Sequence, residues 1–298
     1  MHLFLVDSSI FIFKAWFGSD KERLNLAQQP NQAFLGFTDF VYRLLTEQAP
    51  GKIVFAFDES PKKSARRDIY PAYKANRKPT PDALKRQFAW CQHWVEALGI
   101  ARVSSSSWEA DDLIGSLVHY HRSAQLPVTI LTADKDLAQL IGEGDIWWSY
   151  PDKKLDYRAI SKKFGVRPEQ IADQLALMGD KADNIPGIPG VGRKTAANLL
   201  KKFHTLDQLR LRLAEVHKMK IRYAMQVQRS LIENKDILDI SSQLTRINCG
   251  IEAMQAVDIE RKAIDADKLI AVMRQQAMDS VRQSRWCSYL EKQDPQRS

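Results

Sequence analysis

Three short apolar runs in the first half of the chain each lead into an acidic residue. They are HLFLVD (2–7), KIVFAFD (52–58) and LPVTILTADKD (126–136). Between them, apolar residues recur at three-to-four spacing over 31–48 and 81–100, which indicates helices. The run ARVSS after the second helical pattern is interpreted as one more strand. Alternating strands and helices predict an α/β fold with a mostly parallel central sheet flanked by helices.

Acidic residues follow the ends of these predicted strands. Ligands of parallel sheets bind beyond the carboxyl ends of the strands, and the acids expected at that edge are Asp7, Asp58, Asp134, Asp136, Glu109, Asp111 and Asp112. The last three lie in SSSSWEADDLIGSLVHY, where a simpler interpretation has Ser107 capping a helix. In that case each acid in the first helical turn gains about 0.3–1 kcal/mol from the helix dipole.

Convergence of so many carboxylates changes that interpretation. At about 5 Å and an effective dielectric near 20, each pair would repel by roughly 3 kcal/mol. A cation would then be required. Oxygen ligands without His or Cys suit Mg²⁺ or Mn²⁺.

The second half of the chain has a different sequence pattern. Past residue 150 the sequence is helical and punctuated by Gly and Pro, so a boundary is predicted near residue 160, dividing 1–160 from 161–298. The segment GIPGVGRKTAANLL carries Gly187, Gly190, Gly192 and Lys194. It predicts either a tight turn between helices or a site where backbone N–H groups at a helix start meet a phosphate. Just upstream, Asp180 and Asp183 could join the acidic edge or serve as turn residues.

A basic stretch at about 61–86 leaves the predicted sheet directly after Asp58. It holds nine Lys and Arg residues against two acids, with Tyr70 and Tyr73 among them. One interpretation is a solvated charged face. The other is a surface for single-stranded nucleic acid, since cations contact phosphates and aromatic faces stack on bases.

Composition supports a polyanionic partner. The 298 residues carry 44 Lys and Arg against 36 Asp and Glu, a net charge of +8. Without the nine candidate ligands, 27 acids remain against 44 bases, or +17. An acidic site in a basic body fits a metal-dependent enzyme acting on a phosphate polymer. Cys91, Cys249 and Cys287 have no paired spacing, and neither a signal peptide nor a membrane-length apolar run is present, which predicts a cytoplasmic protein with no membrane association.

Taken together, these motifs resemble the 5′ nuclease family, the flap endonuclease and 5′-to-3′ exonuclease group that includes the N-terminal nuclease domain of bacterial DNA polymerase I. The resemblance follows the order of LFLVDSS, FAFD, YPAYKANRKPTP, WEADDLIG, TADKDLAQL and LALMGDKADNIPGIPGVGRKTA. It implies a PIN-like nuclease core at 1–160 with a basic arch at about 61–86. It also implies a helical DNA-binding unit at 161–298, with a helix-three-turn-helix clamp at about 170–205.

The resemblance also implies roles for individual residues. Two Mg²⁺ ions, for which Mn²⁺ could substitute, would be held by Asp7, Asp58, Glu109 and Asp111, and by Asp112, Asp134, Asp136 and Asp183 with Asp180 acting through water. Lys74 and Arg77 would grip the scissile phosphate, Tyr73 would stack on a base, and the clamp would hold K⁺. Where the family commonly has Gly and Arg, this chain has Ser8 and Lys14. The contact from Lys14 should be weaker, because Lys lacks the bidentate guanidinium.

The predicted function is therefore that of a freestanding, monomeric, structure-specific 5′ nuclease. It would cut DNA at 5′ flaps, nicks and single-strand/duplex junctions, in primer removal and repair. A PIN-type endoribonuclease is one alternative, but its small members lack features such as 61–86 and 187–194. A non-catalytic junction-binding protein is another, and it predicts missing ligands, whereas all nine acids are present.

Overall fold

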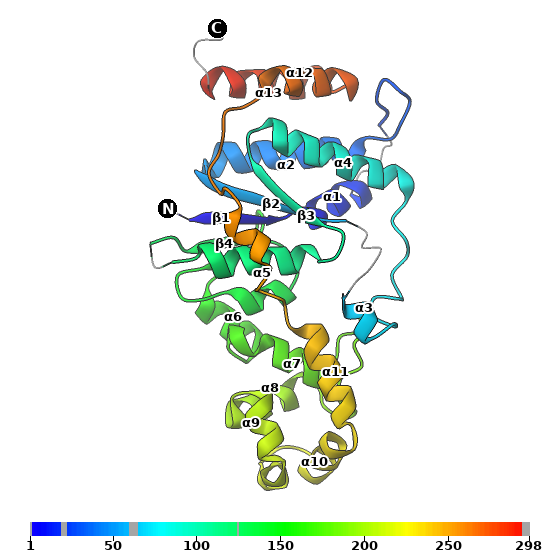
Figure 1. Cartoon of the computed structure of the whole chain (residues 1–298), viewed down its shortest axis with the longest axis vertical. Helices are drawn as coiled ribbons and strands as arrows, with labels where there is room; N and C mark the ends of the chain where they lie inside the picture. The colour runs from blue at the N-terminus through cyan, green and yellow to red at the C-terminus, as the bar shows by residue number, and fades with distance from the viewer. Residues whose placement is uncertain (1, 19–22, 60–64, 124, 294–298) are drawn as a thin grey trace.

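The computed structural model describes residues 2–18, 23–59, 65–123 and 125–293. A six-stranded sheet lies in the upper half of the elongated molecule in Figure 1. Its order is β3-β2-β1-β4-β5-β6, and all neighbours are parallel except β5 and β6. The strands are β1 Leu3–Asp7, β2 Lys52–Asp58, β3 Ala101–Ser105, β4 Val128–Leu131, β5 Ile146–Ser149 and β6 Lys153–Leu155. The predicted mostly parallel sheet and its four predicted strands are confirmed; β5 and β6 were not predicted.

Helices cover both faces of this sheet, which explains the continuous apolar runs of its strands. Side chains alternate between faces, so Leu5 and Val54 enter one core while Val6 and Phe55 enter the other. The first core contains α5 (Ala110–His121). The second contains α1 (Ser8–Phe17), α2 (Gln32–Gln48) and α4 (Asp82–Ala97).

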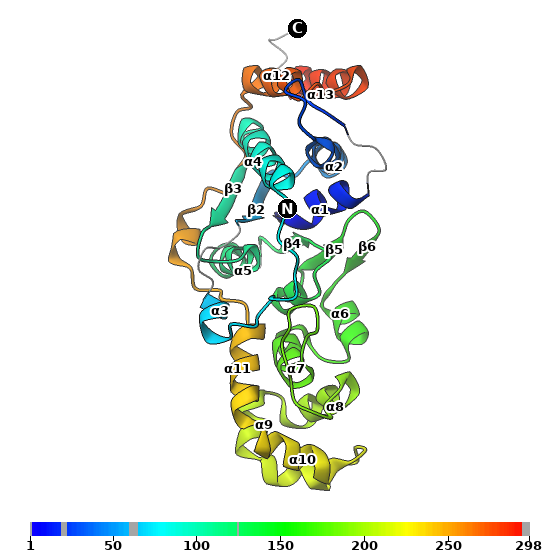
Figure 2. The ribbon, with the colours of Figure 1, turned by 90° about the vertical axis from the view of Figure 1, so that its right-hand side faces the viewer.

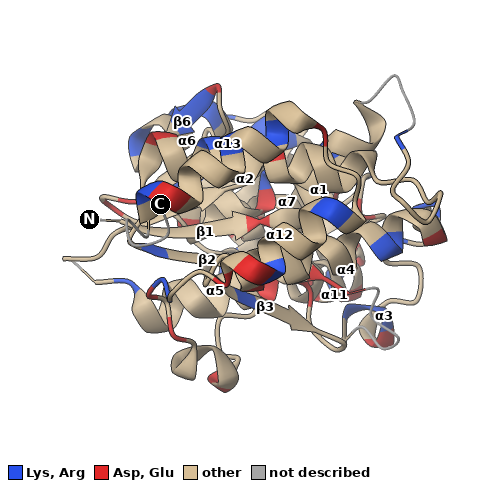
Figure 3. Ribbon diagram, turned by 90° about the horizontal axis from the view of Figure 1, so that it is seen from above, with Lys and Arg blue, Asp and Glu red and all other residues tan. Residues whose placement is uncertain are grey.

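The end of the described chain returns to this second layer. Helices α12 (Ala266–Gln275) and α13 (Ser280–Gln293) lie over α2 and α4 (Figures 1 and 2), where the rings of Trp286 and Trp94 meet edge to face at 4.9 Å. Seen along the long axis, this end carries Lys, Arg, Asp and Glu intermixed (Figure 3). From residue 266 to residue 293 it holds five Lys and Arg against three Asp and Glu.

The opposite end is helical. It is built from α6 Tyr157–Phe164, α7 Ile171–Met178, α8 Arg193–Phe203, α9 Leu206–Leu211, α10 Ala224–Glu233 and α11 Lys235–Thr245. Short helical turns complete the fold: α3 Ala65–Ile69, η1 Asp136–Leu140, η2 Pro168–Gln170, η3 Leu213–Lys218 and η4 Glu252–Ala256. Figure 2 shows α3 beside α11, so the basic stretch returns to the helical end. Over the described ranges, no helix combines the length and apolarity needed to cross a membrane.

Candidate active site

The carboxyl edge of the sheet gathers acids from several segments. Asp7 and Asp58 are the last residues of β1 and β2. Asp58 accepts hydrogen bonds from the backbone N–H of Ala110 (2.8 Å) and the hydroxyl of Ser9 (2.9 Å). The Thr132 hydroxyl, just beyond β4, donates to Asp7 at 2.9 Å. These bonds tie the start of α5 and the segment after β4 to the ends of β1 and β2.

Three carboxyls at this edge carry shifted pKa values. Asp7 is 4% exposed, and its burial, followed by the charge of Asp58, raises its pKa to about 8. Burial and the charges of Asp134 and Asp7 raise the pKa of Asp111 well above its ordinary value. Burial and Asp134 likewise raise the pKa of Asp136 to about 7. Each carboxyl resists ionisation first because it is buried and second because nearby carboxylates repel its charge.

Asp134 and Asp136 follow β4 in a tight turn. The Asp134 carboxylate accepts the backbone N–H of Asp136 at 2.9 Å. Asp136 Oδ1 is buried and has no hydrogen-bond partner, although Lys135 Nζ lies 3.3 Å away as an ion pair. Lys135 also binds the carboxylate of Asp180, which joins this turn to the helical end.

Asp180 and Asp183 occupy a turn closed by paired backbone hydrogen bonds between Asp180 and Ile185. The Asp183 carbonyl accepts the backbone N–H of Lys74 at 2.9 Å, and its carboxylate pairs with Lys74 and Arg77. This turn therefore docks on the basic stretch. Asp180 and Asp183 also lie close enough to Asp136 to raise its pKa, although burial and Asp134 raise that pKa more.

The described part of the basic stretch lies against the acidic edge; residues 61–64 of the predicted arch lie outside the described residues. Lys74 Nζ is 2.9 Å from Glu109. Burial opposes its charge, yet Glu109, Tyr73 and Asp183 together raise the pKa of Lys74.

Tyr73 is buried in this structure, and its ring is not free to stack on a base as predicted. Its ring is 3% exposed and packs with Ile185 and Leu244, and its hydroxyl donates to Glu109 and Asp183.

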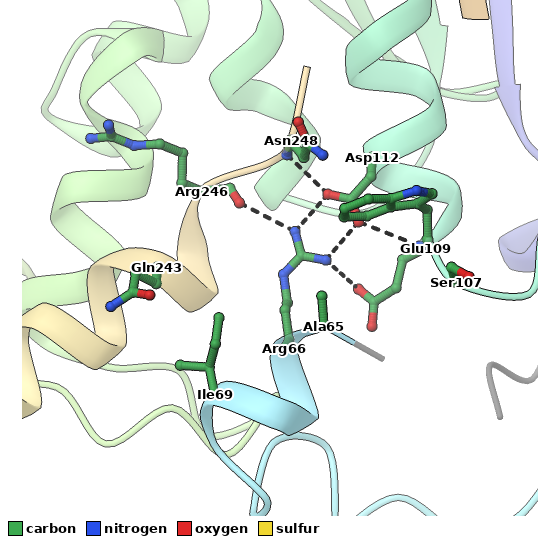
Figure 4. Close-up of a pocket in the computed structure, with 10 residues that line it drawn as sticks. Ala65, Arg66, Ile69, Ser107, Glu109, Asp112, Gln243, Arg246 and Asn248 are labelled. Atoms are coloured by element: carbon green, nitrogen blue, oxygen red, sulfur yellow. Dashed lines mark hydrogen bonds and ion pairs between the residues drawn. The ribbon is translucent and has the colours of Figure 1, made fainter. Parts of the chain in front are cut away.

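Asp112 differs from the expected metal ligand. It is 1% exposed, and both of its oxygens are engaged by the guanidinium of Arg66 at 2.7 and 2.8 Å (Figure 4). The backbone N–H groups of Asn248 and Glu109 donate to the same two oxygens. With two donors on each oxygen, its lone pairs are already used. The alternative in which Ser107 caps the helix is wrong, because Glu109 is the N-cap of α5 and forms a capping box with Asp112.

These residues fit a divalent cation. Within the described chain, no three His, Cys, Asp or Glu side chains are already arranged to hold one ion. The raised pKa values of Asp7, Asp111 and Asp136 nevertheless mark buried carboxyls whose ionisation a bound cation would favour. Asp136 Oδ1 is a buried oxygen without a donor. An all-oxygen set of this kind suits hard ions such as Mg²⁺ or Mn²⁺.

The Gly-rich segment joins α7 to α8 as a compact backbone turn. At Gly187, φ is +63° and an added Cβ would lie 2.2 Å from the Gly179 nitrogen, so only Gly fits. Gly190 has φ of +80°, and around both Gly190 and Gly192 an added Cβ would meet nothing within 4 Å. Gly192 caps α8, whose exposed Lys194 lies in the first turn. The turn thus leaves open space around Gly190 and Gly192, beside the exposed Lys194.

The two departures from the resemblance lie in α1, directly after Asp7. Ser8 is buried, and its hydroxyl is without a hydrogen bond to any described residue. Lys14 is exposed in the last turn of this helix. The structure therefore leaves the Lys14 ammonium accessible to a polyanion.

An acidic edge on a parallel sheet, next to cations and a Gly-rich turn at the start of a helix, is typical of a metal-dependent nuclease. Two family models match the chain: the 5'-3' exonuclease N-terminal resolvase-like domain over residues 2–165, and the 5'-3' exonuclease C-terminal SAM fold over residues 166–267. The chain belongs to the 5'-3' exonuclease family, which confirms the resemblance.

Individual relatives agree with this membership. The 5'-3' exonuclease of Aquifex aeolicus (strain VF5) is 31% identical over 94% of this chain and 93% of its own length. The DNA polymerase I of Rhizobium leguminosarum is 34% identical over 84% of this chain but only 25% of its own length. The chain thus spans about a quarter of that polymerase.

A solved structure confirms the fold. The bacteriophage T5 flap endonuclease, in a pseudo-enzyme-product complex with DNA and metal ions, superposes with a TM-score of 0.66 at 18% identity. The match covers 91% of this chain and 99% of that chain.

Sequence reasoning missed four side chains that organise this edge: Ser9, Arg66, Thr132 and Lys135. Arg66 lies among nine similar cations, and no feature of the sequence distinguishes its inward orientation. Thr132 and Lys135 do lie inside TADKD, so their adjacency to Asp134 was the available signal.

Proposed function

We propose that this protein is a Mg²⁺-dependent, structure-specific 5′ nuclease that hydrolyses DNA phosphodiesters at 5′ flaps, nicks and single-strand/duplex junctions. The observation that carries the proposal is the set of poorly compensated carboxylates around Asp7, Asp111 and Asp136, with Lys74 and Arg77 beside it. Acids alone would repel a phosphate. A cation-dependent site flanked by fixed positive charge can instead bind it.

The carboxylates would divide between two ions. Asp7, Asp58, Glu109 and Asp111 are proposed for one, and Asp134, Asp136 and Asp183, with Asp180 nearby, for the other. When bound, divalent ions stabilise the charge that develops on the phosphodiester and lower the pKa of an attacking water. Lys74 and Arg77 would orient the scissile phosphate, and the hydrogen bonds from Ser9 and Thr132 would hold the oxygens of Asp58 and Asp7 in place.

Charge distribution supports duplex DNA as the partner of the helical end. Residues 193–229 contain ten Lys and Arg against two Asp and Glu, a net charge of +8 equal to that of the whole chain. Gly187, Gly190, Gly192 and Lys194 would contact the backbone of the duplex without reading its sequence. The T5 relative was solved with DNA, which agrees with this assignment.

Several finer points belong to the same proposal. We propose a division near residue 160, a monomer, K⁺ bound by backbone carbonyls of the clamp turn, and roles in primer removal and repair. A cytoplasmic location is supported by Cys91, Cys249 and Cys287, which are free thiols.

One gel experiment tests the function. Labelled flap, nicked, gapped and RNA-primed duplexes are incubated with the protein in Mg²⁺ and in chelator. We expect cleavage near the junction in Mg²⁺ only. Cleavage of single-stranded RNA without a duplex requirement would instead identify an endoribonuclease, and junction binding without cleavage in Mg²⁺ would reject catalysis.

A further inference from the structure

Arg66 has an unusually complete set of contacts. Its guanidinium has five N–H donors. Nε donates to the Leu244 carbonyl (3.0 Å), Nη1 to Glu109 (3.2 Å) and Asp112 (2.8 Å), and Nη2 to Asp112 (2.7 Å) and the Arg246 carbonyl (3.2 Å). All five donors are therefore used by a side chain that is buried, in a protein whose other cations are mostly exposed.

These contacts join three distant segments. Arg66 lies in α3, Glu109 and Asp112 at the start of α5, and residues 244–246 at the end of α11. Figure 4 shows the guanidinium entering between α5 and the segment from Gln243 to Asn248. The neighbouring pocket, about 140 Å³, is lined by these same residues.

A chain of short backbone bonds connects Arg66 with the phosphate-facing residues. The Arg66 carbonyl accepts the N–H of Tyr70, and the Tyr70 carbonyl accepts that of Tyr73, each at 2.9 Å. Lys74 follows with φ of +53°, a conformation that non-glycine residues rarely adopt. The position of Arg66 therefore sets where Tyr73 and Lys74 meet Glu109 and Asp183.

We propose that Arg66 is a positioning residue: it saturates Asp112, so that Asp112 is an anchor and not a metal ligand, and it fixes α3 so that Lys74 reaches Glu109. The part of this inference that concerns turnover rests on the proposed nuclease function. The part that concerns Asp112 does not, because it is tested with metal alone.

The first experiment titrates the protein with Mn²⁺ alone in a calorimeter, comparing Asp112→Asn with Asp134→Asn. Loss of a ligand or of its direct support weakens metal affinity by about 10- to 100-fold. We expect such a loss for Asp134→Asn and a change below about threefold for Asp112→Asn. Equal losses for the two variants would place Asp112 among the residues that hold the metal, as a ligand or as its direct support, and overturn the inference.

The second experiment replaces Arg66 with Ala and measures kcat and KM on a flap substrate. Misplacement of a substrate-orienting group can cost on the order of 100-fold in turnover. We expect that loss in kcat, with KM nearly unchanged. Arg66→Lys, which keeps the charge and loses the fork, should fall between the parent and Arg66→Ala. If Arg66→Ala does not fold, Arg66→Lys takes its place in the comparison of kcat and KM.

Chemical rescue separates positioning from general destabilisation. In Arg66→Ala the vacated space adjoins the pocket, so millimolar guanidinium chloride should bind Asp112 and restore part of kcat. Urea, the uncharged analogue, should not. At these concentrations neither acts as a denaturant.

Arg282→Ala is the matched control. Arg282 is another largely buried arginine that forms a bidentate pair, with Asp39, far from the acidic edge. We expect it to lower the melting temperature without changing kcat and without guanidinium rescue. If Arg66→Ala behaves like Arg282→Ala, Arg66 is merely structural and the inference fails. If the parent does not cleave flaps, the proposed function fails while the Mn²⁺ titration still decides the status of Asp112.

Discussion

Two groups of carboxylates share one edge of the sheet and are treated in opposite ways. Around Asp7, Asp111 and Asp136, acids face acids, and the pKa values of all three carboxyls are raised. Around Glu109 and Asp112, the protein supplies its own cations through Lys74 and Arg66. The difference shows that the chain compensates the charge of Asp112 fully and that of Glu109 in part, and compensates the other three carboxyls less.

This division has an energetic basis. A buried carboxylate paired with a guanidinium loses water but recovers charge-assisted hydrogen bonds. A buried carboxylate beside other carboxylates recovers less, here one hydroxyl hydrogen bond at Asp7 and one ion pair at Asp136. The uncompensated group therefore lowers the stability of the metal-free protein, and that instability is the driving force for metal binding.

The largest effect is expected for Asp134→Asn, which removes one carboxylate charge while keeping the shape of the side chain. We expect cleavage of a 5′-flap substrate in Mg²⁺ to fall by about 100- to 1,000-fold, the cost of losing one transition-state contact in other enzymes. In chelator, the melting temperature should not fall, because Asp134 repels Asp111 and Asp136. Parental cleavage rates would show that this group is not the catalytic one.

Lys74→Ala tests the compensated side and should have a smaller effect. Glu109 keeps its contact with Arg66, so the site should survive without Lys74, the cation that we propose to orient the phosphate. We expect turnover on the flap substrate to fall by about 10- to 100-fold, a typical loss when one positioned group is removed. Arg77→Ala, at a more exposed site, should lose less. Unchanged turnover in both would reject their role beneath the arch.

The pH dependence of stability distinguishes the two groups without measuring catalysis. Unfolded Asp titrates near its ordinary pKa of 3.8, whereas the folded values are about 8 for Asp7 and about 7 for Asp136. Between these limits the folded state holds more protons, so the free energy of unfolding falls as pH rises. Melting in chelator should therefore drop by several degrees from about pH 5 to pH 8. Saturating Mg²⁺ should flatten this slope, and an identical slope with the ion would contradict the cation site.

The smallest effect is expected at the clamp. Lys194→Ala should lower the salt slope of duplex binding by about 0.9, the contribution of one phosphate contact. Fluorescence anisotropy at several salt concentrations in chelator measures it. Lys292→Ala, an exposed lysine at the end of α13, should leave the slope unchanged. Equal slopes for the parent and both variants would remove Lys194 from the interface.

Much of the fold could be predicted because its strands carry a simple signal. β1, β2 and β4 are buried on both faces and read as apolar runs ending in acids. β5 and β6 were missed because IWWS and KKL are short and mixed, and their place follows from pairing with β4 and with each other. Sequence distance also hides the return of α12 and α13 to the second layer, which depends on contacts such as Trp286 with Trp94.

The sequence predicted which acids gather at the edge of the sheet better than it predicted which residues contact them. Strand ends placed Asp7 and Asp58 correctly at one edge, because parallel strands share their direction. The pairing of Asp112 with Arg66 could not be predicted, since it spans 46 residues and depends on how α3 docks. Burial of Tyr73 has the same origin, because Ile185 and Leu244 close over its ring only in the folded chain.

In the turn between α7 and α8, some glycines are required by the fold, whereas others have open space around them. A library randomised from residue 179 to residue 192 and selected only for expression should retain Gly179 and Gly187, where a Cβ would strike backbone atoms at 2.7 and 2.2 Å. The same library selected for cleavage should also enrich Gly at position 192, where the chain itself has room for any side chain. Asp180 and Asp183, which we propose for the metal site, should also be enriched by selection for cleavage. The other residues that differ between the two selections would then outline the footprint of the nucleic acid on this turn.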